Sequence, residues 1–300
     1  MELSFLTKLR ITAVIAAGAL LIGIFAWPLA KPADPFGAVS LVAGNISCSN
    51  AMTLVPLAFV TGLLAFFISW PYGQNIGVLA VPSGLAVWAV RSGNVAELMR
   101  QNYSVAARQQ LFDSLKWEPL YWLALVVAGF LGVLLAQKIA RQKTEKAADE
   151  KHNSRLSIYL NGILALAISV VFAKLCLAIL AQDVHLPDDK LGSVVVQLVI
   201  GQIVFAVLVS FGLVAFAVKK FLNADYIWPT IATALLHPVI ISIYLRPDLL
   251  QYLSQRWPAV VFSNPLVSIL PVQMVAFGTL GSVAGYWMAV RYDYWRKHES

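Results

Sequence analysis

Charged residues are scarce in this chain, and cysteines are scarcer still. Only 12% of the 300 residues are Asp, Glu, Lys or Arg, while 59% are hydrophobic; soluble domains have about 25% charged residues. With a mean hydropathy of +0.75, the chain has too little polar surface for soluble domains, so most of its surroundings must be lipid. The two cysteines, Cys48 and Cys176, exclude a disulfide scaffold, and the lack of long charged tracts excludes a disordered chain.

Carboxylates are absent from every long apolar run, which argues against proton or sodium coupling through a buried acid. The chain also has no phosphate-binding glycine loop, no metalloprotease or serine-hydrolase motif and no cysteine pair at metal spacing. A single histidine in the apolar runs, His237, is too few for a bis-histidine haem or a zinc site. We therefore expect no catalytic residues, no metal and no cofactor, and an enzyme is the least favoured class.

Eight apolar runs are long enough to cross roughly 30 Å of hydrocarbon. Lys174 is their only charged residue, as expected where a charge at the centre of the bilayer costs about 2.5–3.5 kcal/mol. This segregation predicts an all-α polytopic membrane protein with eight transmembrane helices. The predicted spans are residues 11–30, 51–70, 74–90, 120–137, 158–181, 191–218, 227–245 and 266–290.

The distribution of charge between loops predicts the orientation. With eight spans, the loops on the side of the two termini contain 13 basic and 7 acidic residues, against 8 and 8 on the other side. Basic loops stay in the cytoplasm, so we expect an inner (plasma) membrane protein with both termini cytoplasmic. The net charge of +7 then reflects topology, and no nucleic-acid partner is expected. Pro28 fits poorly before a cleavage site at Ala30, so the first run is predicted to be retained as a signal anchor.

The order of spans and loops in the first half recurs in the second. Residues 76–91 align without a gap on residues 231–246, with Pro82 and Pro238 near the middle of each segment and an arginine at its end. This pattern predicts two parallel four-span repeats, related by an axis along the membrane normal. The predicted units are an N-terminal half (1–137), a charged cytoplasmic linker (138–157) and a C-terminal half (158–300).

Segments 91–118 and 246–258 are predicted to form amphipathic helices on the extracytoplasmic face, one for each repeat. Leu98, Phe112 and Leu253 lie on their apolar faces. Such a face either docks a partner or covers a central site, or it packs at the membrane interface with no further role. These three residues are the candidates for partner docking.

Lys174 and His237 are the two ionisable residues within the runs, and such residues are the first place to look for function in a membrane. Lys174 either extends its amine toward the headgroups or lines an anion or substrate pathway. His237 precedes Pro238, which removes a backbone hydrogen bond. It is either a core histidine beside a kink or a contact for a proton or substrate.

Intramembrane amides form the other polar set, accompanied by Thr230 and Thr233. They either join helices through hydrogen bonds or line a solute pathway, and both alternatives stay open. Outside the spans, Asp183, Asp188 and Asp189 lie with His185 in one loop, which indicates a solvated turn more than a divalent-cation site. The amides are Asn161, Gln197, Gln202 and Gln273.

Two functions follow from these patterns. The first is a permease-like transporter of a small neutral or anionic solute, supported by the repeat and by the proline-interrupted third and seventh spans. The alternative is a non-catalytic scaffold or anchor subunit that binds partner membrane subunits through its outer helices. In both cases the lipid bilayer is the main partner.

Overall fold

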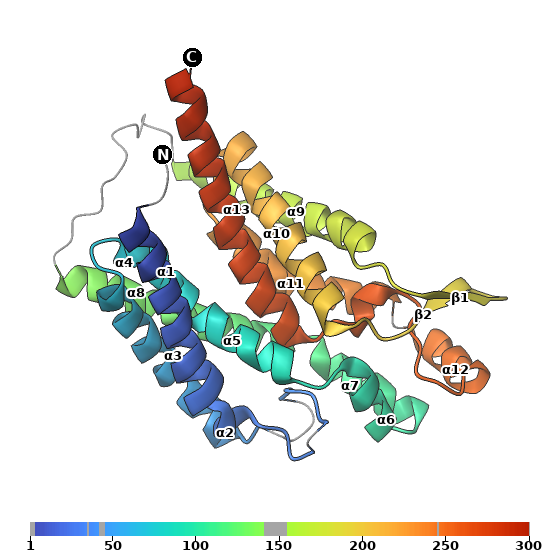
Figure 1. Ribbon diagram of the computed structural model, residues 1–300. Helices are drawn as coiled ribbons and strands as arrows, with labels where there is room; N and C mark the ends of the chain where they lie inside the picture. Colours follow the sequence, from blue (N-terminus) through green and yellow to red (C-terminus); the bar gives the residue numbers. More distant parts are fainter. Residues whose placement is uncertain (1–3, 35, 42–45, 141–154, 245, 300) are drawn as a thin grey trace.

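The computed structural model describes residues 4–34, 36–41, 46–140, 155–244 and 246–299, whose regular secondary structure is helical apart from one small β-hairpin (Figure 1). The predicted all-α class is therefore confirmed in its main feature. The first half contains α1 (Phe5–Gly18), the π-helix η1 (Ala19–Phe25), α2 (Trp27–Ala30), α3 (Cys48–Ile68), α4 (Gly73–Ile76), the 3₁₀ turn η2 (Gly77–Leu79), α5 (Ala80–Arg91), α6 (Val95–Gln101), α7 (Val105–Leu115) and α8 (Glu118–Ile139). The second contains α9 (Arg155–Leu180), β1 (His185–Asp188), β2 (Gly192–Val195), α10 (Ile200–Leu222), α11 (Ile227–Tyr244), α12 (Pro247–Arg256), the 3₁₀ turn η3 (Pro265–Ser268) and α13 (Pro271–Glu299).

Within the described residues, six helical segments are long and apolar enough to cross a membrane. A seventh is formed if Ile227–Ser242 and Pro247–Arg256, which bend by 69°, are one broken span. The chain is thus a multi-pass membrane protein. The six correspond to all the predicted spans except 227–245 and 266–290, so the count of eight is not established by length and apolarity alone.

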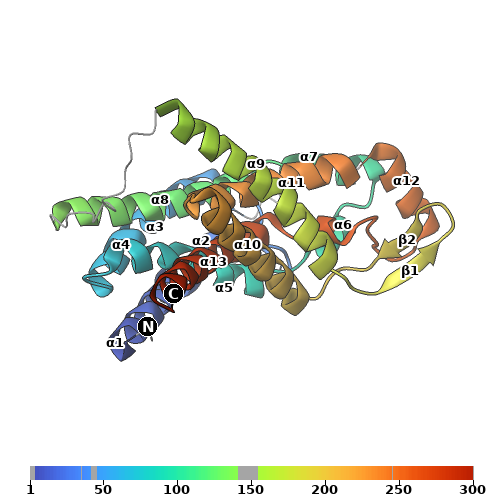
Figure 2. The same cartoon turned by 90° about the horizontal axis from the view of Figure 1, so that it is seen from above.

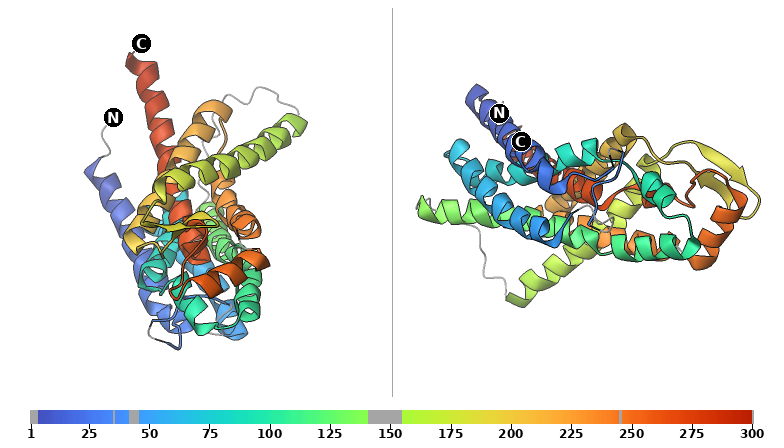
Figure 3. Two further views of the ribbon diagram at one scale, coloured as in Figure 1. Left: turned by 90° about the vertical axis from the view of Figure 1, so that its right-hand side faces the viewer. Right: turned by 90° about the horizontal axis from the view of Figure 1, so that it is seen from below.

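The cap, by which we mean α6, α7, α12 and the β1–β2 hairpin, lies at one end of the helical bundle. Figures 1 and 2 show the chain termini at the opposite end, and the right panel of Figure 3 shows the same separation from below. Within the cap, α7 packs against α12. Helices were predicted in both segments, and both are observed, as the pair α6–α7 and as α12.

Helix α5 lies at the centre of the bundle. Its segment Gly73–Arg91 is 72% buried, against 22–50% for the other five candidate spans. It packs against η1 and α13, and Trp88 donates its indole N–H to the carbonyl of Gly23 in η1 (3.1 Å). This segment is the least apolar of the six candidate spans. Small residues such as Gly84 let neighbouring helices approach it closely.

The predicted span 191–218 is wrong at its beginning. Residues His185–Asp188 and Gly192–Val195 form an antiparallel hairpin in which Leu186 lies opposite Val194, and the helix begins at Ile200 and continues to Leu222. Gly192 adopts a positive φ of 74° at the turn, which glycine does at no steric cost. Most of the predicted linker, residues 141–154, lies outside the described residues.

Candidate functional site

Helix α11 carries a polar stripe on its buried side. Thr230, Thr233 and His237 follow one another at spacings of three and four residues, which places them on one helical face. All three are at most 2% exposed. The stripe therefore faces the protein interior, where lipid does not reach it.

Three helices meet at this stripe. A Cβ atom at Gly278 of α13 would lie 2.5 Å from the Thr233 methyl carbon and 3.1 Å from the Phe211 ring of α10. Ser210 precedes Phe211, and Thr279 follows Gly278. Both are fully buried. We call the five buried polar residues that lie within one helical turn of this meeting point along their own helices the buried polar cluster: Ser210, Thr230, Thr233, His237 and Thr279.

Most of the cluster lacks hydrogen-bond partners among the described residues. Both ring nitrogens of His237 and the hydroxyls of Ser210, Thr230 and Thr279 are buried and unpartnered, while the Thr233 hydroxyl donates to the Thr230 carbonyl (2.6 Å). An unmade hydrogen bond of a buried group costs about 1–3 kcal/mol. Unpartnered buried groups call for an explanation such as a bound polar molecule, and four such residues on three helices that meet call for it more strongly than one.

The chemistry of the cluster suits an uncharged polar ligand. A hydroxyl can both donate and accept a hydrogen bond, and a neutral imidazole offers one donor and one acceptor. None of the five members is Asp, Glu, Lys or Arg, so nothing within it would neutralise an ion.

Three of the predicted pathway amides bind backbone instead. Gln273 accepts from the Leu270 N–H and donates to the Ala89 carbonyl, so it joins α13 to α5. Gln202 donates to the Leu180 carbonyl (2.6 Å) and joins α10 to α9. Gln197 lies in the extended segment before α10, where it accepts from the Ala96 N–H and donates to the Ser268 carbonyl. These contacts favour the helix-joining alternative for all three.

The other predicted residues lie apart from the cluster. Asn161 is exposed and Lys174 is half-buried, both on α9. The docking candidates Leu98, Phe112 and Leu253 are at most 6% exposed and pack inside the folded chain. Docking through these three stays a prediction, and it now requires that the cap opens.

Glu118 is a buried carboxylate that the apolar runs did not reveal. It stands in the first turn of α8 and is 4% exposed. It accepts hydrogen bonds from the Ser40 hydroxyl (2.6 Å), the Trp122 indole N–H (2.8 Å) and the Leu41 backbone N–H. These bonds attach the segment 36–41 to the cap end of α8.

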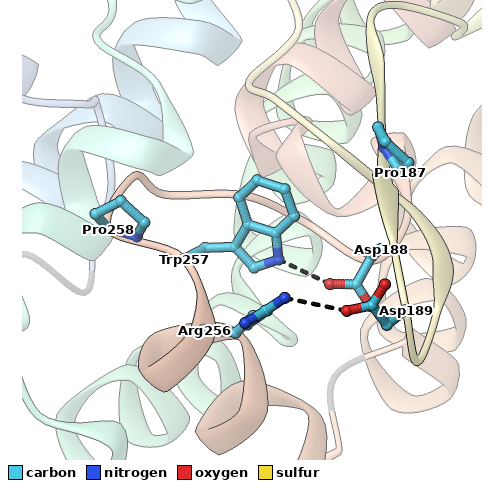
Figure 4. A pocket seen from close by; sticks show the side chains of 6 residues that line it. All are labelled: Pro187, Asp188, Asp189, Arg256, Trp257 and Pro258. Carbon is cyan, nitrogen blue, oxygen red and sulfur yellow. Dashed lines mark hydrogen bonds and ion pairs between the residues drawn. The ribbon is translucent and has the colours of Figure 1, made fainter.

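Asp188 is a second buried carboxylate, and it fastens the hairpin to α12 (Figure 4). The Trp257 indole N–H (2.9 Å) and the Tyr252 hydroxyl (3.0 Å) donate to it, as do the backbone N–H groups of Lys190 and Leu191. Next to it, Asp189 forms an ion pair with Arg256 (3.0 Å). Asp188, Asp189, Arg256 and Trp257 line a pocket of ≈ 270 Å³ between the hairpin and α12.

His185 and Asp188 belong to strand β1 of the hairpin, Asp189 lies in its exposed turn, and Asp183 precedes the hairpin. The Asp188 carboxylate already accepts hydrogen bonds from the four donors just described. Within the described residues, no three His, Cys, Asp or Glu side chains are grouped so as to hold a metal ion.

The contact between the hairpin and α12 should persist until strongly acidic pH. Burial alone would raise the pKa of Asp188, but the hydrogen bonds from Trp257, Leu191, Lys190 and Tyr252 together hold that pKa below its ordinary value. A carboxylate with a lowered pKa stabilises the fold above its unfolded-state pKa, about 3.9, and this stabilisation is lost as the pH falls through the folded-state value. We expect the NMR resonance of the Trp257 indole N–H to stay constant from pH 7 to about pH 4 and to move toward the free-indole position only below it.

Asp188→Asn should move the same resonance at neutral pH, because the new amide group places a donor against four donors. Asp189→Asn is the matched control, since the side chain of Asp189 is 87% exposed, and it should leave the resonance in place. An Asp188→Asn spectrum identical to wild type would contradict the role given to this carboxylate.

Comparison of the chain with protein-family models, with curated proteins and with solved structures found no match.

Proposed function

We propose that this chain is a permease-like transporter whose solute is a small, uncharged, polar molecule that contacts the buried polar cluster. The observation that carries the proposal is the set of unpartnered buried polar atoms on α10, α11 and α13. In a chain that spans a membrane, such atoms are costly without a partner and typically mark a pathway. Because the cluster has no charged residue, a neutral solute is favoured over an anionic one.

The proposal includes eight spans arranged as two parallel repeats, and glycine contacts support this arrangement. In the first half, α3 and α8 approach so closely that a Cβ at Gly62 would overlap the carbonyl of Gly129. In the second half, a Cβ at Gly285 of α13 would overlap the carbonyl of Gly212 in α10. The proposed second and fourth spans of each half thus meet at glycines in both halves, which supports the duplication.

Contacts between the halves support the same arrangement. Helix α5, the third span, packs against α13, the eighth, and α8, the fourth, packs against α11, the seventh. A two-fold axis along the membrane normal exchanges these two contacts. In this topology both termini lie on the basic side, which the positive-inside rule assigns to the cytoplasm.

Osmotic swelling of proteoliposomes tests the transport function, and it can be run before the natural solute is identified. Wild-type protein should speed the swelling of vesicles placed in at least one of glycerol, ribitol, urea or acetamide, relative to empty vesicles. His237→Leu and Ser210→Ala should each reduce that rate by about tenfold or more, the loss expected from removing a required polar contact. Both variants should remain folded, because neither leaves a described hydrogen-bond partner unpaired.

Ser282→Ala is the matched control. Ser282 is also fully buried on α13, but its hydroxyl donates to the Gly278 carbonyl of its own helix (2.7 Å). Its replacement should leave the swelling rate unchanged. Wild-type rates for His237→Leu and Ser210→Ala, or no faster swelling by the wild type in any of the four solutes, would overturn the proposal.

A scaffold or anchor subunit is the second candidate, and one observation favours it. Large apolar side chains point outward from the cap and the loops beside it: Tyr103 is 88% exposed, Val184 61% and Trp117 60%. Exposed apolar groups of this kind can seat a partner. Native mass spectrometry after gentle extraction should then detect a stoichiometric partner subunit that Tyr103→Ser and Trp117→Ser release, and a lone chain or homo-oligomer would remove this candidate.

A further inference from the structure

At the end of the bundle opposite the cap, the last turn of α10 lies beside the C-terminal part of α13, the longest helix (Figure 1). Lys219 and Lys220 follow an apolar run, Gly201–Val218, that rises about 27 Å. This length matches the hydrocarbon thickness of a bilayer. If α10 spans the membrane, the two lysines lie at the level of the lipid headgroups.

Aromatic rings of α13 hold these cations in place. The Lys220 Nζ lies 4.3 Å from the ring centroid of Tyr292, and the Lys219 Nζ lies 5.3 Å from that of Tyr286. One position before Tyr292, the Arg291 guanidinium lies 4.9 Å from the Trp295 ring. A cation above an aromatic face keeps its charge and its remaining hydrogen-bond donors. Lys219, Lys220 and Arg291 are called the three cations below.

None of the three cations forms an ion pair with a described carboxylate. The ion pairs Arg100–Glu97 and Arg256–Asp189 both lie in the cap. Lys219 also donates to the Asn223 side chain (2.7 Å), which uses only one of its three donors. Asp225 and Asp293 are the nearest acids in sequence, and neither lies within ion-pair distance of the three cations.

We propose that the three cations form a binding site for the phosphate headgroup of an anionic phospholipid. The chemistry fits at each point: the cations offer several N–H donors to phosphate oxygens, the tyrosine and tryptophan rings belong at the headgroup level, and the α10–α13 contact continues into the bilayer, where acyl chains can lie. Basic residues at the end of a transmembrane helix, at the level of the headgroups, attract anionic lipids. This site is independent of the proposed transport function.

Native mass spectrometry of protein released from vesicles made of equal parts phosphatidylglycerol and phosphatidylcholine tests the site. Wild-type protein should retain one phosphatidylglycerol molecule in preference to phosphatidylcholine. Changing the three cations to glutamine should reduce that retention about tenfold or more, because each interfacial cation contributes about fivefold to the binding of an anionic lipid. Changing both lysines to arginine should preserve the retention, which shows that charge at this place is what matters.

The matched control removes the same charge from the opposite end of the bundle, through Lys31→Gln, Lys116→Gln and Lys190→Gln together. It should retain phosphatidylglycerol as the wild type does. Equal loss in this control would show a general effect of net charge and overturn the site, as would unchanged retention when the three cations are replaced. Displacement of the lipid by millimolar inorganic phosphate would show that the site takes free phosphate, and would overturn its assignment to a lipid.

Discussion

Glu118→Ala is expected to lower the free energy of unfolding by about 3 kcal/mol or more. The loss has a specific origin, since removal of the carboxylate takes one acceptor from each of three donors: the Ser40 hydroxyl, the Leu41 N–H and the Trp122 indole N–H. Each such group costs about 1–3 kcal/mol. Removing the carboxylate also removes the cost of burying its charge, which offsets part of that loss.

The effect of Glu118→Ala should concentrate in the segment 36–41. This segment is also held by the Gly93 N–H, which donates to the Gly37 carbonyl (3.0 Å), and by the Ser92 hydroxyl, which accepts from the Val39 N–H (2.7 Å). Without the carboxylate these bonds remain, but the end of the segment loses its hydrogen bonds to α8. Hydrogen exchange of its backbone amides should therefore become faster, while that of α3 stays unchanged.

Unfolding in detergent micelles, followed by circular dichroism, measures the change in stability. Glu97→Ala is the matched control, because Glu97 pairs only with the exposed Arg100 at a spacing of three residues. An exposed pair of this kind is worth about 0.3–0.5 kcal/mol. Glu118→Gln should fall between the two, since its amide keeps one acceptor oxygen. Equal stability of the Glu118 and Glu97 alanine variants would contradict the structural role of the buried carboxylate.

Sequence alone does not reveal Glu118, for a physical reason. It lies two residues before an apolar run and therefore resembles an ordinary loop residue. Its burial depends on the segment 36–41, and its partner Ser40 is 78 positions away in the chain. No local pattern contains that information. The run after it, in contrast, predicts α8 correctly, because apolarity over the length of a bilayer is a local property.

The hairpin is the opposite case. Strand and turn signals are present in its sequence, but the length of the apolar run outweighs them. The apolar stretch Val194–Val196 is separated by Gln197 alone from the apolar residues that lead into α10, and a short apolar run does not distinguish a strand from a buried helix. Its β-branched residues favour a strand. Pro187 and Gly192, which both precede it, indicate a turn. Length is the stronger criterion, and it extends the predicted helix too far toward the N-terminus.

The buried polar cluster lies between these two cases. The spacing of Thr230, Thr233 and His237 is visible in the sequence and places them on one face of a helix. Which helices that face meets is not visible there. The contribution of Ser210 and Thr279, and the separation of Gln202 and Gln273 from the cluster, follow from tertiary packing that apolar periodicity does not encode.

Gly285→Ala is the second variant with a large expected effect, of about 3 kcal/mol in the free energy of unfolding. Small residues let membrane helices approach closely, and van der Waals packing is then the main force that joins them. A single methyl group at Gly285 would overlap the Gly212 carbonyl, and a backbone atom cannot turn away as a side chain does. Helices α10 and α13 must therefore separate along the contact that also holds the buried polar cluster.

Gly201→Ala provides the control, since it adds the same methyl group to α10 at a place with no heavy atom within 4 Å. It should raise stability by up to about 1 kcal/mol through helix propensity. The sign of the effect therefore separates the two substitutions, in the same micelle unfolding experiment. A Gly285→Ala protein as stable as Gly201→Ala would mean that α10 and α13 do not meet at these glycines, and it would remove both the glycine argument for the repeat and the geometry of the buried polar cluster.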